Sequence, residues 1–263
     1  MSKDPPNSFD AIFRIHKILD ATANAHAELS KRDLVNLPRL TLAIIDDLDT
    51  SLTPVLVAIL QRRFRNCFVN AYSGRSDHVT KLLQQREAEI CVSASVPDNV
   101  NDFRTIPILR EPFILVTAKG LLKKGQDICA QLSDAPFIQY SEAIPMGKAI
   151  AQHLKRVRLE VTQRYALEAS RSVIAMVGQA KGWTLTTPLN LLDAERFIPQ
   201  VDVDQVPFPA FSRTIYLIAR RAELGDLPDC LAEDCRHLVR TQVAPRFAER
   251  VPRMAEAIEV AKG

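Results

Sequence analysis

The chain has 263 residues, of which 47% are hydrophobic, and its 34 basic and 31 acidic residues leave a net charge of +3. These values are typical of a globular protein with a sizeable core, and they exclude a composition-based argument for a nucleic-acid-binding surface. The sequence shows no secretory signal pattern and no apolar run long enough to span a membrane, so we expect a cytoplasmic protein without membrane contact.

The first predicted element is a helix over residues 9–29. Its apolar positions recur at steps of three and four residues and form a weak stripe that includes Thr22 and His26. Two interpretations stay open: the helix pairs with a second copy of the chain, or it packs on its own domain. We assign residues 1–36 to this helix and its connection, with dimerisation as its expected role.

An alternating series of strands and helices follows the connection. The pattern predicts strands at 40–45, 67–72 and 88–93, helices at 52–64 and 77–85, and turns at 46–47 and 73–76. Such alternation is typical of an α/β fold with a largely parallel sheet, in which ligands bind beyond the carboxyl ends of the strands. The two turns are expected to lie at that edge.

A long apolar strand at 107–117 is expected to leave this first lobe, after which the pattern restarts. Strands are predicted at 137–140, 161–167 and 183–186, with helices at 147–157 and 172–180, and Ser170 as a helix cap. A second apolar strand at 214–219 is expected to return the chain. Two α/β lobes joined by two crossing strands predict a cleft that closes on a small ligand.

The sequence offers little sign of catalytic, cofactor or metal chemistry. The eight glycines are too dispersed for a phosphate loop or a dinucleotide-binding turn, and the nucleophile elbow of serine hydrolases is absent. Cys230 and Cys235 lack a second ligand pair, and the five scattered cysteines are typical of free thiols in a reducing compartment. We therefore expect no cofactor, no metal and no catalytic residue.

Five segments in order carry a resemblance to a known family. They are Leu-Ala-Ile-Ile-Asp-Asp-Leu at 42–48 and the segments at 83–92, 107–116, 174–188 and 211–220. Together they resemble the regulatory domain of LysR-type transcriptional regulators. The resemblance implies a two-lobed, type 2 periplasmic-binding-protein-like α/β fold with an N-terminal linker helix. It implies lobe I at 37–112 with 213–263, and lobe II at 113–212.

The resemblance also implies partners and a binding site. We expect a small-molecule effector, a homo-oligomer (a dimer or a tetramer), and DNA contact only through an N-terminal helix-turn-helix that these residues do not contain. The implied ligand-binding residues lie after strands and at helix starts, where amides and hydroxyls bind polar ligands. They are Asp47, Leu48, Ser76, Ser141, Gly147, Glu168 and Ser170.

Asp47 is an unusual residue for such a place, because its carboxylate would repel an anionic effector. One hypothesis is an effector with a cationic or donor-rich group facing Asp47, and the alternative is that Asp47 only caps the following turn. The leading interpretation of the whole chain is an effector sensor. Its alternatives are a solute-binding protein of the same fold, which needs an export signal, and an enzyme, for which only Asp46 and Asp47 offer a candidate base.

Overall fold

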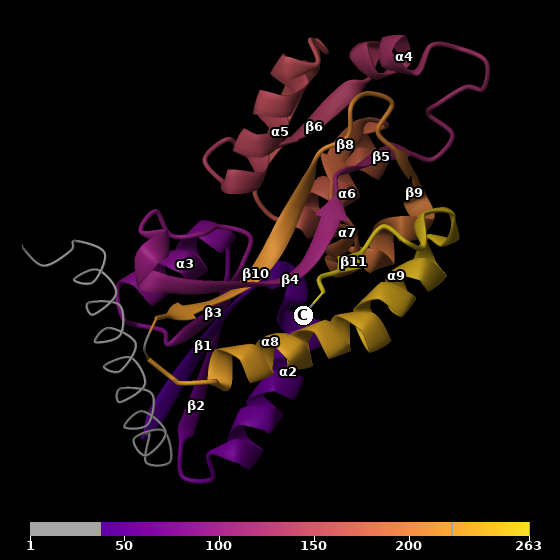
Figure 1. Ribbon diagram of the computed structural model, residues 1–263. Coiled ribbons are helices and arrows are strands. Elements are labelled where there is room, and N and C mark those ends of the chain that lie inside the picture. The colour runs from indigo at the N-terminus through magenta and orange to yellow at the C-terminus, as the bar shows by residue number, and fades with distance from the viewer. Residues whose placement is uncertain (1–37, 222, 263) are drawn as a thin grey trace, which may run out of the picture.

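The computed structural model describes residues 38–221 and 223–262, which form two sheets flanked by helices (Figure 1). The predicted helix at 9–29, and with it the expected dimerisation segment at 1–36, lies outside the described residues. Within the described residues, no helix has both the length and the apolar character needed to cross a bilayer.

The first sheet has six strands in the order β11-β4-β10-β3-β1-β2. Its strands are β1 (Arg39–Ile45), β2 (Phe68–Gly74), β3 (Ile90–Ser93), β4 (Phe103–Pro112), β10 (Ser212–Arg220) and β11 (Glu259–Val260). The strands β2, β1 and β3 run parallel, whereas β10 is antiparallel to β3 and β4. Residues 40–45 of β1 are all buried, as expected of a parallel strand covered on both faces.

Helices pack on this sheet through regularly spaced apolar residues. They are α2 (Asp46–Arg63), α3 (Ser76–Gln84) and α8 (Leu227–Leu238). The chain also forms η1 (Val100–Asp102), a π turn, η3 (Val239–Val243), that joins α8 to α9 (Ala244–Arg250), and η4 (Pro252–Met254). On α2 the fully buried leucines recur every fourth residue, at Leu48, Leu52, Leu56 and Leu60. This spacing places all four on one helix face, which fixes the direction of α2 from the end of β1.

The second sheet has five strands in the order β7-β6-β8-β5-β9. Its strands are β5 (Ile114–Ala118), β6 (Pro136–Tyr140), β7 (Thr162–Leu167), β8 (Trp183–Thr186) and β9 (Val201–Gln205), and its helices are α4 (Ile128–Asp134), α5 (Pro145–Arg156), α6 (Ser170–Ala180), α7 (Pro188–Asp193) and η2 (Glu195–Gln200). Trp183 is fully buried and its indole N–H donates to the Leu132 carbonyl at 2.7 Å. The two sheets form the two lobes expected from the sequence.

The predicted crossing strand at 107–117 is wrong in one respect, because it is two strands in different sheets. β4 ends at Pro112 and β5 begins at Ile114. Between them the Phe113 ring stacks on Phe211, with centroids 3.9 Å apart, and the Phe113 N–H donates to the Phe211 carbonyl at 2.8 Å. His153 of lobe II also stacks on Phe211, at 3.8 Å. The two crossings therefore meet at one aromatic contact, which the order of residues along the chain does not reveal.

Two local predictions also need correction. Asp46 and Asp47 do not form a turn but the first residues of α2, which begins six residues earlier than predicted. Acidic side chains are favourable there because the helix dipole leaves the N-terminus partly positive. Ser170 is not a cap: it is the first residue of α6, Ala169 occupies the cap position, and no side-chain cap bond forms. The division of the chain at 112/113 and 212/213 stays a prediction.

Candidate functional site

A cleft of about 610 Å³ opens between the two lobes. Lobe I lines it with the starts of α2 and α3, and lobe II lines it with the starts of α5 and α6 and with Asn190 and Asp193 of α7. Phe113 and Phe211 of the crossings form part of the wall. A cleft of this size matches the usual range for sites that bind small molecules.

Four of the seven residues expected at the site line the cleft: Asp47, Ser76, Glu168 and Ser170. The other three, Leu48, Ser141 and Gly147, do not. Leu48 is fully buried in the α2 face that packs on the sheet. A Cβ on Gly147 would lie 2.1 Å from the Ser141 carbonyl oxygen, so the missing side chain permits close packing of α5 on the preceding loop. A ligand-binding role for all seven stays a prediction.

The deep end of the cleft is occupied by an ion-pair network, the Arg213 cluster, defined as Asp47, Glu111, Asn190 and Arg213. The Arg213 guanidinium donates to Glu111 Oε1 at 2.7 Å and to Asp47 Oδ2 at 2.6 Å. Only 15% of the Arg213 side chain and none of the Glu111 side chain is exposed. Burial raises the pKa of Glu111 and Arg213 counteracts part of that rise. Burial disfavours the charged guanidinium, yet Glu111 and Asp47 hold the pKa of Arg213 above its ordinary value.

Asn190 connects this cluster to lobe II. With its amide nitrogen turned toward α2, Asn190 donates to Asp47 Oδ1 at 2.6 Å, and it lies 2.6 Å from the Ser170 hydroxyl. The Leu189 N–H at the start of α7 donates to Glu111 at 2.9 Å. The carboxylates of lobe I are thus held by donors from lobe II. Asp47 does not cap its own helix, because its partners are Arg213 and Asn190.

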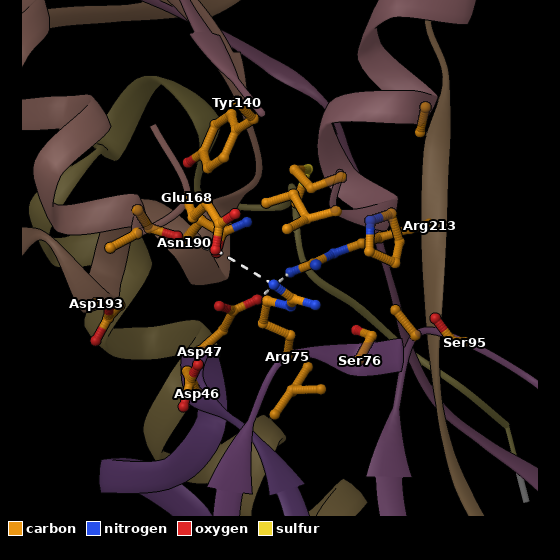
Figure 2. A pocket seen from close by; sticks show the side chains of 18 of the residues that line it. Asp46, Asp47, Arg75, Ser76, Ser95, Tyr140, Glu168, Asn190, Asp193 and Arg213 are labelled. Atoms are coloured by element: carbon orange, nitrogen blue, oxygen red, sulfur yellow. Dashed lines mark hydrogen bonds and ion pairs between the residues drawn. The ribbon is translucent and has the colours of Figure 1, made fainter. Parts of the chain in front are cut away.

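The mouth of the cleft carries a second contact between the lobes, the Arg75 pair, defined as Arg75 and Glu168. Arg75 precedes α3 and donates to Glu168 Oε2, which follows β7 in lobe II, at 3.2 Å (Figure 2). Arg75 also pairs with Asp77 at 3.0 Å, and this contact, followed by the charge of Glu168, raises the pKa of Arg75. The side chains of Arg75 and Glu168 are 43% and 54% exposed, respectively.

An acidic edge completes the lobe I side of the cleft. Asp46 and Asp49 lie three residues apart in the first turn of α2, facing Asp193 and Arg171 of lobe II. Arg171 donates twice to Asp193 Oδ1, at 3.0 and 2.6 Å. Burial, and then the charges of Asp47, Asp193 and Asp49, raise the pKa of Asp46. Negative charge therefore exceeds positive charge at this edge.

Hydroxyl groups lie at the opposite side of the cleft. Ser76 and Ser95 both line it, and the buried Ser93 hydroxyl supports them by donating to the Ser76 carbonyl at 3.1 Å and accepting from the Ser95 N–H at 3.0 Å. Among the residues that the structure describes, the Ser76 hydroxyl has no hydrogen-bond partner. The start of α3 and these hydroxyls supply donors to a polar ligand group.

Several residues at the site were not expected from the sequence: Arg75, Tyr140, Asn190, Asp193 and Arg213. Two of them stand out in the sequence pattern. Asn190 is the only polar residue in the buried stretch 188–192, and Arg213 is a charge at the start of an apolar strand. Tyr140 lies at the end of β6, where burial raises its pKa to about 12 and its hydroxyl lies 2.9 Å from Thr186 Oγ1. The described residues contain no group of three or more side chains suited to a metal ion.

Comparisons with known proteins agree with this architecture. The family model described as "LysR substrate binding domain" matches residues 36–241. No curated protein sequence matches the chain.

Solved structures with the same fold include three regulators. The regulatory domain of Synechocystis PCC6803 CcmR in complex with 2-PG is 17% identical, with a TM-score of 0.62 over 78% of this chain and 98% of that one. The effector binding domain of QuiR in complex with shikimate is 14% identical, with a TM-score of 0.60 over 76% and 95%. A cysteine-to-serine mutant of Corynebacterium glutamicum OxyR with H2O2 bound is 17% identical, with a TM-score of 0.66 over 94% and 79%. The chain shares their two-lobed, type 2 periplasmic-binding-protein-like fold.

Proposed function

Because the chain belongs to the family of LysR substrate binding domains, we propose that its inter-lobe cleft binds the small-molecule effector of a transcriptional regulator. The observation that carries this proposal is the lining of the cleft, which comes from both lobes and from both crossing segments. A ligand in such a place contacts two bodies at once. Its binding free energy therefore depends on how the lobes are arranged, which is the requirement for a sensor.

The contacts across the cleft support a change in lobe arrangement on binding. The Arg75 pair joins the lobes at the mouth and is largely exposed, so its net contribution to closure is small. The aromatic contact of Phe113, Phe211 and His153 lies at the crossings, where the lobes remain joined. Ligand groups that bridge the lobes would add to the weak mouth contact and favour the closed arrangement.

The proposal is tested by locating a ligand and following the lobes. A thermal-shift screen of small carboxylates, amines and sugars identifies compounds that stabilise the protein, since a ligand of the folded state raises the melting temperature. Amide chemical shifts are then mapped with and without each such compound. We expect the perturbed amides to come from the starts of α2, α3, α6 and α7 together. Perturbations confined to one lobe, or conversion of the compound into a product, would contradict the proposal.

We also propose that the regulator acts as a homo-oligomer, either a dimer or a tetramer, and reaches DNA through a helix-turn-helix. The support is the family membership, in which a regulatory domain is joined to a DNA-binding head through a linker helix. Native mass spectrometry of the full chain, with and without residues 1–36, measures the contribution of the expected linker helix. A chain that is monomeric in both forms would contradict the oligomeric part of the proposal.

A further inference from the structure

The cleft has an electrostatic character that narrows the chemical class of its ligand. We propose that the effector carries a cationic amine or guanidinium group, which binds at the acidic edge formed by Asp46 and Asp49 of α2. This inference rests on the proposed function, because it concerns the ligand of the same cleft. It differs from the hypothesis drawn from the sequence in placing the cation at Asp46 and Asp49 instead of at Asp47.

The first argument is the balance of charges that line the cleft. Five carboxylates line it against three guanidinium groups, and the carboxylates are Asp46, Asp47, Asp49, Glu168 and Asp193. Each of the three guanidinium groups, on Arg75, Arg171 and Arg213, already lies within 3.2 Å of a carboxylate of this chain. An anionic effector would have to displace one of these pairs, and it would meet the remaining negative charge.

Asp47 is satisfied within the protein. Arg213 takes Oδ2 at 2.6 Å and Asn190 lies 2.6 Å from Oδ1. Only 13% of the Asp47 side chain is exposed. A ligand cation at Asp47 would therefore compete with a buried guanidinium that also holds Glu111, which is costly to leave without its partner.

Asp46 and Asp49 differ from Asp47 in their ion pairing. Among the described residues, neither carboxylate has a cation within ion-pair distance, and the side-chain contact of Asp49 is the Thr53 hydroxyl at 2.7 Å. The two lie three residues apart in one helix turn, so their carboxylates share one face of α2. Burial is the largest cause of the raised pKa of Asp46, followed by the charges of Asp47, Asp193 and Asp49, and Arg171 counteracts part of the rise.

A guanidinium group of the protein itself already lies in the lining of the cleft. Arg75 projects from lobe I and pairs with Glu168 of lobe II across the mouth (Figure 2). Apolar side chains, among them Met146 and Phe211, also line the cleft, and they suit the carbon skeleton of a ligand. The ligand class is thus an amine or guanidinium compound with an apolar body, whose other end meets Ser76 and Ser95.

The test compares probes of matched shape and opposite charge. Benzamidine and benzoate share a ring, and agmatine and glutarate are both short flexible chains. Isothermal titration with the full chain at low and high salt measures binding of each probe. We expect benzamidine or agmatine to bind and the anions to bind at least about tenfold more weakly, with the difference reduced at high salt.

Two variants assign the binding to the acidic edge. The double variant Asp46→Asn/Asp49→Asn should weaken binding of the cationic probe roughly tenfold, as expected for the loss of a charge-assisted hydrogen bond. The matched control is Asp98→Asn, an exposed aspartate that does not line the cleft, and it should leave the affinity unchanged. Far-ultraviolet circular dichroism verifies that each variant is folded.

The remaining outcomes separate this inference from the proposed function. If the anions bind in the cleft and the cations do not, the inference is overturned while the cleft remains a ligand site. The inference is also overturned if the cations bind equally well to the double variant. If amide shifts place every bound probe outside the cleft, the proposed function fails together with the inference.

Discussion

Two sets of polar contacts connect the lobes, and they differ in burial. The Arg213 cluster lies at the deep end, where the side chains of Arg213 and Glu111 are 15% and 0% exposed. The Arg75 pair lies at the mouth, where Arg75 and Glu168 are 43% and 54% exposed. The Arg75 pair joins charges of the two lobes, whereas the ion pairs of the Arg213 cluster lie within lobe I and receive hydrogen bonds from Leu189 and Asn190 of lobe II. Water screens only the Arg75 pair effectively.

The difference indicates how the cleft moves. Breaking a buried Arg213 pair would leave a charge without water or a partner, so the carboxylates that Leu189 and Asn190 contact are held firmly in place. Breaking an exposed pair costs little, because water replaces the lost partner. The cleft is therefore joined firmly at the crossings and weakly at the mouth, as a hinged clamp requires. The predictions below test this contrast, from the largest expected effect to the smallest.

Removal of the buried cation should have the largest effect. Arg213→Met leaves Glu111 and Asp47 without their cation, and we expect a loss of about 3–5 kcal/mol in the free energy of unfolding. Urea denaturation measures it. The control is Arg213→Met/Glu111→Gln, which removes the buried charge and keeps an acceptor for the Leu189 N–H, and it should recover part of the loss. If Arg213→Met alone is as stable as the wild type, the buried contact contributes no more to stability than the exposed one.

Neutralisation of Asp47 should have an intermediate effect. Asp47→Asn keeps the side-chain shape but loses the charge paired with Arg213, and we expect a cost of roughly 1–3 kcal/mol in urea denaturation. The affinity for a cationic probe should fall less than in Asp46→Asn/Asp49→Asn. If Asp47→Asn instead lowers the affinity and leaves the stability unchanged, the ligand cation binds at Asp47.

Removal of the mouth contact should change the lobe arrangement more than the stability. Arg75→Gln is expected to alter the free energy of unfolding by less than about 1 kcal/mol. It should increase the radius of gyration in small-angle X-ray scattering, because the lobes open. Arg86→Gln breaks an exposed pair with Glu223 away from the cleft and serves as the control. Equal scattering from both variants would show that the Arg75 pair does not hold the mouth.

The titration of Asp46 should show the smallest effect. Its pKa is raised from 3.8 by burial and by Asp47, Asp193 and Asp49, and Asp49→Asn should lower it. Because the folded-state pKa is the higher one, the stability that protonated Asp46 contributes is complete below about pH 3.8 and is lost as pH rises through the raised value. Carboxyl ¹³C NMR titrations of both proteins measure this shift. Identical Asp46 curves would show that Asp49 does not act on Asp46.

Much of the fold was predictable because it depends on local patterns. The buried runs of β1 and β3, and the alternation of strands with helices, indicate an α/β fold without reference to distant residues. The positions of Ser76, Glu168 and Ser170 were implied by the family resemblance, and they lie at strand ends and helix starts, which gather at one edge of a parallel sheet. These three residues do line the cleft.

The errors arose where a residue's environment depends on distant parts of the chain. Leu48 stands beside Asp47 but lies on the opposite, buried face of α2. The break at Phe113 divides the segment interpreted as one apolar strand, and the chain moves from one sheet to the other directly after Arg110, Glu111 and Pro112.

The sequence by itself determined the α/β class, the two lobes and the set of strand ends at which polar residues gather, because hydrophobic periodicity encodes them locally. Only the tertiary structure decided which charges meet. Arg213 and Asp47 are 166 positions apart, and the chain crossing at Phe113 and Phe211 brings their side chains together at 2.6 Å. That contact satisfies Asp47 and leaves Asp46 and Asp49 facing the cleft, because charge pairing depends on distance in space and leaves no periodic pattern along the chain.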